Sequence, residues 1–351
     1  MGRPSYSNKT NSLPTAYPWG DLSDQDLLDL RLCDLKIQLN DTWIMGCVRQ
    51  LNQELDRVGL RVRPHVWLSS EWFSPDGVPG IAIPFYLSHG RLMRLEKKQM
   101  LEVEGGSPQK CMKILRHEAG HCIDTAYRLH QRKQWKQFFG SYTTPYPDAY
   151  RPDPASHGFV LHLDWWYAQA HPAEDFAETF AVWLTPNSRW RQHYQTWPAL
   201  RKLEYVDQLM DQIRGTPPKI RSRRQVEPVS QIQTTLRQHY DHKRQRHMDG
   251  WPELYDLDLH RLFSNDSKFR GRPTAASFLR QIHPQVRKIV SDWTGSHPYT
   301  IDHILRSMIG RCKELRLRLM LPEDHSRVQT MIMVTIKTLH FAQIGHHRIP
   351  I

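Results

Sequence analysis

Cysteine is scarce in this sequence, with five residues in 351, and no two of them form a CxxC pair. Their number is odd and their spacing is wide, so the sequence predicts no disulfide framework and fits a reducing compartment. The sequence also lacks an apolar segment near the N-terminus and any run of about 18 apolar residues. We therefore expect no signal peptide and no transmembrane helix, and the default location is the cytoplasm.

The charge is unevenly distributed along the chain, which carries a net charge of +12. Residues 1–210 hold 24 Lys and Arg against 23 Asp and Glu, whereas the residues after 210 hold 24 against 13. Such a basic region attracts polyanions, so a nucleic acid, an anionic membrane or an acidic peptide is a candidate partner. An ordinary solvated basic surface is the simpler interpretation.

Hydrophobic periodicity predicts an α+β protein whose C-terminal region is mostly helical. Two strands are expected, over 61–70 and 80–87, and Pro84 favours a sheet edge for the second. Residues 1–20 are typical of a loose tail, 131–163 of a loop rich in Pro and Tyr, and 215–225 of a linker. Helices are expected over 23–59, 88–104, 109–130, 172–184, 198–213, 228–246, 273–292, 300–320 and 325–343.

The most informative segment is HEAGH, residues 117–121, inside the helix expected over 109–130. Four helical residues turn through about 400°, so His117 and His121 lie on one face and can share a cation. Imidazole nitrogen suits zinc. Glu118 is offset from that face, in a position to take a proton from a zinc-bound water. A helix that carries these residues by chance is the alternative, but its apolar flanks would then bury unpartnered polar groups.

A second segment, HPAEDFAETFAVWL (171–184), places Glu174 and Glu178 on one helical face. An acid in the first turn of a helix often serves only as a partner of the helix dipole. Glu178 lies deeper in an apolar stretch, where an unpaired carboxylate would be costly. Both positions are explained if Glu174 is the third zinc ligand and Glu178 accepts a hydrogen bond from the ring N–H of a ligand histidine.

A metzincin site is excluded, because its motif HExxHxxGxxH needs Gly where Asp124 stands and His where Tyr127 stands. Asp124 lies one turn beyond His121. It either supports a ligand or is an ordinary polar residue of the helix. His162 and His171 are other conceivable ligands without the same carboxylate geometry, and His171, which precedes Pro172, is more typical of a helix cap.

The two motifs together resemble a family of zinc-binding metallopeptidases that carry HExGH followed by HPxEDWAET. They are similar, more remotely, to the catalytic domain of anthrax lethal factor, so the implied site is of the gluzincin type. The resemblance implies Glu174 as a ligand and Glu178 as its supporting residue. It also implies that Tyr167, seven residues before Glu174, stabilises the oxyanion. As one of the aromatic residues in DWWY (164–167), Tyr167 has an equally good alternative role in core packing.

The resemblance covers roughly residues 60–210. It implies a zincin-like metallopeptidase core with a small mixed sheet, an edge strand and active-site helices. The linker at 215–225 sets the boundary, so we expect this domain over 21–214 and a basic helical region over 215–351, which the resemblance does not cover. The chain departs from the family at Ala173 and Phe176, where tryptophans are common. These differences change packing and remove no ligand.

The expected activity is zinc-dependent hydrolysis of a peptide or protein substrate, with Glu118 activating a zinc-bound water. An extended substrate would add to the edge strand 80–87. The expected zinc ligands are His117, His121 and Glu174. The alternative function is a nucleic-acid- or partner-binding protein with a basic tail and a structural zinc site, motivated by IRSRRQ (220–225), HKRQRH (242–247) and CKELRLRL (312–319). A structural site has no need of Glu118, which favours the peptidase.

Overall fold

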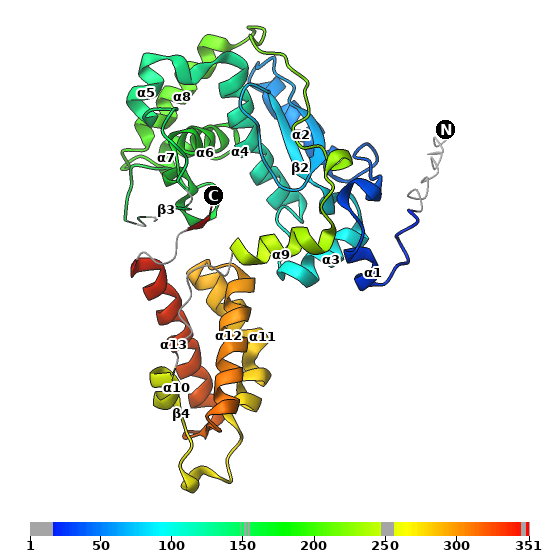
Figure 1. The fold of residues 1–351 in the computed structure, drawn as a ribbon. Helices are drawn as coiled ribbons and strands as arrows, with labels where there is room; N and C mark the ends of the chain where they lie inside the picture. The colour runs from blue at the N-terminus through cyan, green and yellow to red at the C-terminus, as the bar shows by residue number, and fades with distance from the viewer. Residues whose placement is uncertain are drawn as a thin grey trace, which may run out of the picture.

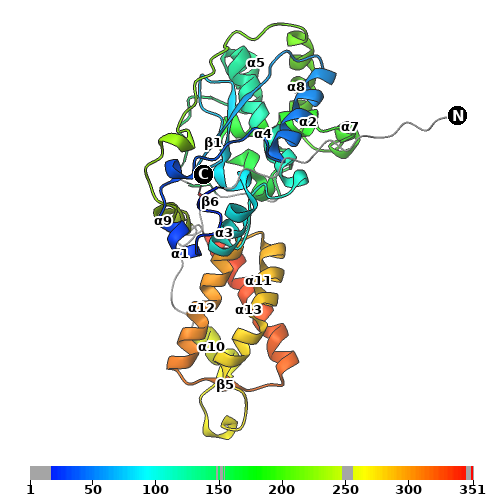
Figure 2. The same cartoon turned by 90° about the vertical axis from the view of Figure 1, so that its right-hand side faces the viewer.

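The computed structural model describes residues 17–147, 149–150, 153, 155–246, 256–344 and 349–350, so most of the tail predicted over 1–20 lies outside it. Figures 1 and 2 show an upper body of mixed helices and strands and, below it, an elongated bundle of helices. The predicted α+β class is confirmed, with helices dominating. No helix within these ranges combines the length and the apolar composition needed to cross a bilayer.

The elements of the two bodies follow one another along the chain. The upper body contains α1 (Asp24–Leu28), η1 (Leu32–Leu35), α2 (Ile44–Arg57), β1 (His65–Ser69), β2 (Gly80–Pro84), η2 (Phe85–Ser88), α3 (Gly90–Met100), α4 (Pro108–Tyr127), η3 (Leu129–Gln131), α5 (Lys133–Phe139), β3 (Ala149–Tyr150), η4 (Asp164–Gln169), α6 (Pro172–Leu184), α7 (Trp190–His193), α8 (Leu200–Ile213), η5 (Val229–Gln231) and α9 (Leu236–Arg246). The bundle contains α10 (Asp256–Leu262), β4 (Phe263–Ser264), η6 (Ser267–Phe269), α11 (Ala275–Thr294), α12 (Pro298–Glu314), β5 (Arg318–Leu319) and α13 (Glu323–Ile344). The last strand, β6 (Ile349–Pro350), pairs with β3 in antiparallel fashion.

Each body has a hydrophobic core of its own. The upper core includes Leu236 and Tyr240 of α9, whereas the core of the bundle contains residues from Leu259 to Val334. The segment 215–246 therefore packs on the upper body because its apolar side chains are buried there. The two cores divide the chain after α9, later than the boundary at 215 suggested by the sequence.

The small sheet of β1 and β2 is parallel, with a register that runs from His65 opposite Gly80 to Ser69 opposite Pro84. The connection between these strands turns back, and Phe73 pairs with Ala82 in antiparallel fashion. The amide of Ala82 donates to the carbonyl of Phe73 over 2.8 Å. The edge of β2 that we predicted to receive a substrate is thus occupied at this point by the chain's own backbone.

The segment 131–163, predicted to be a loop, contains the short helix α5. Trp135 and Phe139 of this helix are buried in the upper core. Helices this short derive their stability from tertiary packing and not from propensity, so a seven-residue helix leaves little periodic signal. Helix α10 was not predicted for the same reason.

Helices α4 and α6 pack against each other at the centre of the upper body, where Gly120 faces Ala177 (Figure 1). A Cβ atom added to Gly120 would lie 2.7 Å from the Cα of Ala177, closer than non-bonded carbon atoms approach. Because the contacted atom belongs to the backbone, no side-chain rotation can relieve the clash. Glycine at this position therefore sets the separation of the two helices.

Two buried ion pairs hold these helices in place. Arg116 of α4 donates two hydrogen bonds of 2.8 Å to Glu54 of α2. Lys202 of α8 donates to Asp175 of α6 over 2.6 Å, and burial raises the pKa of that carboxyl to about 7 despite the lysine. Removing one partner of such a pair leaves an uncompensated buried charge, so both helices are tied to their neighbours.

The substitution Gly120→Ala is expected to lower the free energy of unfolding by about 1–3 kcal/mol, because the new methyl group forces α4 and α6 apart. Urea denaturation of both proteins measures the difference. Gly310→Ala in α12, where a Cβ would meet open space, is the control and should be neutral or stabilising by about 1 kcal/mol. Equal stability of Gly120→Ala and the wild type would show that the close approach is no constraint.

Candidate metal centre

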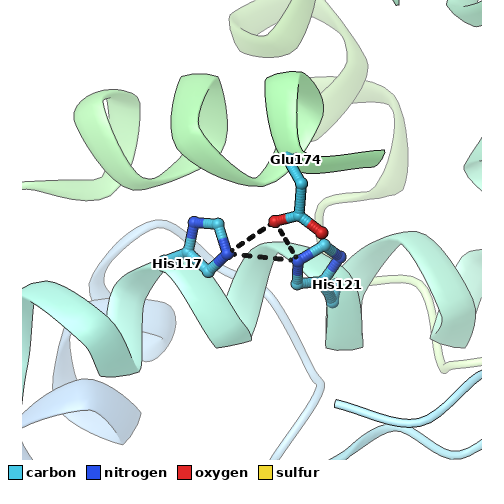
Figure 3. Close-up of side chains that lie close together, drawn as sticks. All are labelled: His117, His121 and Glu174. Atoms are coloured by element: carbon cyan, nitrogen blue, oxygen red, sulfur yellow. Dashed lines mark hydrogen bonds and ion pairs between the residues drawn. The ribbon is translucent and has the colours of Figure 1, made fainter. Parts of the chain in front are cut away.

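The three residues predicted as ligands converge between α4 and α6, as Figure 3 shows. The Nε2 atoms of His117 and His121 lie 3.2 Å apart. Oε2 of Glu174 lies 3.0 Å from the first of these atoms and 3.2 Å from the second. Tetrahedral ligands at about 2.0–2.1 Å from zinc are roughly 3.3 Å from one another, so the spacing fits a shared metal ion. This buried group of two histidines and a glutamate can hold one.

Local sequence determines where the two helices begin and hence where these side chains lie. Ser107 caps α4 by accepting from the amide of Lys110, and Pro108 follows in the first turn. On α6, Nδ1 of His171 accepts from the amide of Ala173 over 3.1 Å. This confirms His171 as the cap predicted from the sequence. Nε2 of His162 lies 2.8 Å from the carbonyl oxygen of Lys113, so neither histidine joins the candidate ligands.

Glu178 makes the hydrogen bond expected for a residue that supports a ligand. Its Oε1 lies 2.8 Å from Nδ1 of His117, and its Oε2 accepts from the amide of Leu163 over 2.8 Å. When Nδ1 donates to a carboxylate, the lone pair of the imidazole is on Nε2, the atom that faces Glu174. Glu178 is completely buried, so this orientation is fixed by the protein interior.

The electrostatics of the centre favour positive charge. Burial acts to lower the pKa of His117, but hydrogen bonds to Glu174 and Glu178 outweigh it and raise this pKa well above its ordinary value. The pKa of His121 is raised in the same way, against burial, by the charge of Glu174. Burial in turn raises the pKa of Glu174, but the two histidines outweigh it and hold this pKa well below its usual range. A metal cation would satisfy the same carboxylates that otherwise retain protons on the imidazoles.

Glu118, next to His117 on α4, borders a cavity of about 310 Å³. The residue is only 6% exposed, and its Oε2 is buried without a hydrogen-bond partner. A carboxylate oxygen in this condition is costly unless a ligand, a cation or water meets it. The residues that line the cavity are Trp72, Phe73, Ser74, Asp76, His117, Glu118, His121, Thr125, Tyr142, Tyr146, Tyr167 and Glu174.

Tyr167 lies on η4 and lines this cavity. Its ring centroid is 5.5 Å from that of His117. Burial, together with the charges of Glu174 and Glu118, raises the pKa of Tyr167 well above its ordinary value. The hydroxyl therefore keeps its proton at neutral pH and can donate a hydrogen bond into the cavity.

Asp124 is directed to a different partner from the one the sequence suggested. Its Oδ2 lies 2.5 Å from Nδ1 of His130, and no hydrogen bond joins it to a candidate ligand among the described residues. The ring of His130 stacks on that of Tyr142 at 4.2 Å, and the hydroxyl of Tyr142 donates to Asp76. Asp124 thus supports, through His130, two residues that line the cavity.

Tyr146 is a residue of the centre that sequence reasoning missed. Its hydroxyl donates to Oε1 of Glu174 over 2.8 Å, and its ring stacks on His171 with centroids 3.7 Å apart. It lies in the loop that follows α5, where the only signal was a composition rich in Tyr and Pro. Contacts made by such a loop depend on its conformation, which carries no periodic signature.

The residues of this centre, and no relative of the chain, indicate what the protein could do. Comparisons with protein-family models, with curated proteins and with solved structures find no match. The family resemblance of the two motifs therefore stays an expectation.

Zinc binding is expected to release protons and to strengthen as pH rises through neutrality. The raised pKa values keep His117 and His121 protonated above pH 6.5, the ordinary value, and a metal must displace those protons. Lower pH therefore weakens binding. Calorimetric titration of zinc into chelator-treated protein, in buffers of different ionisation enthalpy, measures the protons released. An affinity that is constant from pH 6 to pH 8 would contradict this result.

Glu178→Gln is expected to lower zinc affinity by about 10- to 100-fold with the fold retained, because it removes the charge behind His117. Competition with a chromophoric chelator measures the affinity, and circular dichroism checks the fold. Glu204→Gln, at an exposed position of α8, is the matched control and should bind zinc like the wild type. Equal affinities in the two variants would remove Glu178 from its supporting role.

Proposed function

We propose that this protein is a zinc-dependent peptidase. Two imidazoles and one glutamate are a donor set used by catalytic zinc in peptidases. The resemblance of HEAGH and HPAEDFAET to the gluzincin family favours the same activity and, with it, a zincin-like core around α4 and α6. All five cysteines are free thiols, which fits the cytoplasmic location that we propose.

The proposal rests on the position of Glu118 and on the lack of a hydrogen bond to one of its oxygens. Its carboxylate is held beside the three candidate ligands and at the wall of the cavity, with one oxygen free of any hydrogen bond. A general base needs a free lone pair within reach of the proton that it takes. No group among the described residues donates to this oxygen, and it lies beside the candidate ligands, so a role in the reaction explains the burial of Glu118 best.

In the proposed reaction, His117, His121 and Glu174 would hold zinc, which when bound supplies Lewis acidity to a carbonyl and to water. Glu118 takes a proton from the attacking water while the oxygen of that water bonds to the carbonyl carbon. Tyr167 donates a hydrogen bond to the oxygen on which negative charge develops. Glu118 then gives the proton to the amine nitrogen as the carbon–nitrogen bond breaks, leaving a carboxylic acid and an amine.

The cavity and the number of ligands favour this reaction over a structural zinc site. Structural sites are usually closed by four protein ligands. Among the described residues, three side chains converge here, and they border a cavity that also contains Tyr167 and Glu118. Five of the residues that line the cavity are aromatic, which suits the side chains of a peptide.

The substitution Glu118→Gln is expected to leave zinc binding intact while lowering kcat/KM by about 10²- to 10⁴-fold, because the amide cannot accept the proton. A peptide library identifies a cleaved sequence with the wild type, and metal analysis gives the zinc content of both proteins. Glu204→Gln is again the control. Full activity of Glu118→Gln would remove Glu118 as the base, and absence of zinc from the wild type would remove the proposal itself.

A further inference from the structure

Some cations of the other two basic segments that suggested a polyanion partner are engaged inside the fold. Lys243 of HKRQRH is buried, with its Nζ 2.9 Å from Glu96 and 3.6 Å from Glu71. In CKELRLRL, Nη1 of Arg318 donates to the carbonyl of Arg272 over 2.6 Å, whereas Lys313 and Arg316 are exposed. Because Lys243 and Arg318 serve internal contacts, the regional excess of positive charge overstates what the surface presents.

The basic segment that contains IRSRRQ presents more exposed cations than CKELRLRL does. Residues 214–226 contain five Lys and Arg and no acid. Within it, the side chains of Lys219, Arg221, Arg223 and Arg224 are exposed, and the described part of the chain offers them no ion-pair partner within 4.0 Å. The segment has no helix or strand, and Figure 2 shows it as a long stretch of chain along the outside of the upper body.

Backbone contacts fix this segment against the upper body. The amides of Lys219 and Ile220 both donate to the carbonyl of Ala126, near the end of α4. Further along, Nε2 of His65 on β1 lies 3.0 Å from the carbonyl oxygen of Arg224. The segment is therefore fixed on the surface and is not a free linker. Figure 2 shows it passing from α8 to α9 on the side of β1.

Two further exposed cations adjoin this segment. Arg128 follows Tyr127 at the end of α4, two residues beyond the carbonyl that holds Lys219. Nη1 of Arg61 donates to the carbonyl of Gly215 over 3.4 Å. We call the resulting set the basic strip, and its members are Arg61, Arg128, Lys219, Arg221, Arg223 and Arg224.

We propose that the basic strip binds the phosphodiester backbone of a nucleic acid. Guanidinium groups match phosphate oxygens in geometry and charge, and repeated cations along an extended segment suit a repeated anion. None of the exposed large apolar side chains in the described residues lies on the strip. It therefore lacks the apolar groups that would insert into a membrane or anchor an apolar peptide. The strip contacts phosphates, so its binding does not depend on the base sequence of the nucleic acid.

The strip and the candidate metal centre are formed by different residues of the upper body. The strip is held against β1 and the end of α4, whereas the cavity is lined by residues of the connection from β1 to β2, of α4, of α6 and of the chain between α5 and α6. The inference stands independently of the proposed peptidase activity.

The test uses full-length protein and fluorescence anisotropy with labelled single-stranded DNA, duplex DNA and polyglutamate. The strip variant carries Lys219→Gln, Arg221→Gln, Arg223→Gln and Arg224→Gln. The control variant carries Lys133→Gln, Lys136→Gln, Lys313→Gln and Arg316→Gln, which removes the same charge at exposed positions without ion pairs. Zinc content and circular dichroism confirm that both variants are folded.

Wild type and control are expected to bind DNA alike, with log Kobs falling against log salt by about 0.7 per phosphate contact on single strands and 0.9 on duplex. The strip variant should lose at least about tenfold in affinity at 50 mM salt, and its salt slope should be smaller by roughly 3. The preferred DNA form tells whether single strands or duplexes are the source of the phosphates. Equal losses in both variants, or tighter binding of polyglutamate than of DNA, would overturn the proposal.

Discussion

Helices α4 and α6 approach each other closely because Gly120 has no side chain where Ala177 crosses it. On α4 this glycine stands between His117 and His121, and on α6 Ala177 lies between Glu174 and Glu178. The crossing therefore brings a pair of imidazoles to a pair of carboxylates. Glu174 lies 3.0 and 3.2 Å from the two histidines, and a wider separation of the helices would lengthen these distances. The chemistry of the centre thus depends on the absence of a side chain at Gly120, which allows the two helices to approach.

This close approach has an electrostatic cost, because it buries acidic side chains between two helices. Part of the cost is offset by hydrogen bonds, from His117 and the amide of Leu163 to Glu178 and from Tyr146 to Glu174. These bonds leave Oε2 of Glu174 facing the Nε2 atoms of the two histidines. Between those atoms, only a proton or a metal cation satisfies the lone pairs. The interior therefore selects for positive charge at the place where the ligands meet.

The elements of the site that were predictable from sequence are those with regular spacing. His117 and His121 are four residues apart on one helix, as are Glu174 and Glu178 on another, so helix geometry alone puts each pair on one face. Bringing the two faces together needed only that both helices join one core. The cap at His171 was also predictable, because it depends on neighbouring residues.

Other parts of the site were not predictable because they depend on the path of irregular chain. Tyr146 reaches Glu174 from a loop, and Asp124 finds its partner in His130 after the helix has ended. Phe73 covers the edge of β2 through a turn back of the connection. None of these contacts has a period in the sequence, so knowledge of each residue type did not reveal its partner.

Helix α13 shows a case in which hydrophobicity indicates no preferred face, because apolar side chains are spread around the helix. It exposes Val328, Ile332 and Ile336 and buries Thr330 and Thr338. The buried hydroxyls donate to carbonyls one turn earlier in their own helix, both over 2.7 Å, so burial leaves them satisfied. A pattern of hydrophobicity does not predict that the threonines turn inward, because it takes no account of polar groups that are satisfied within the helix.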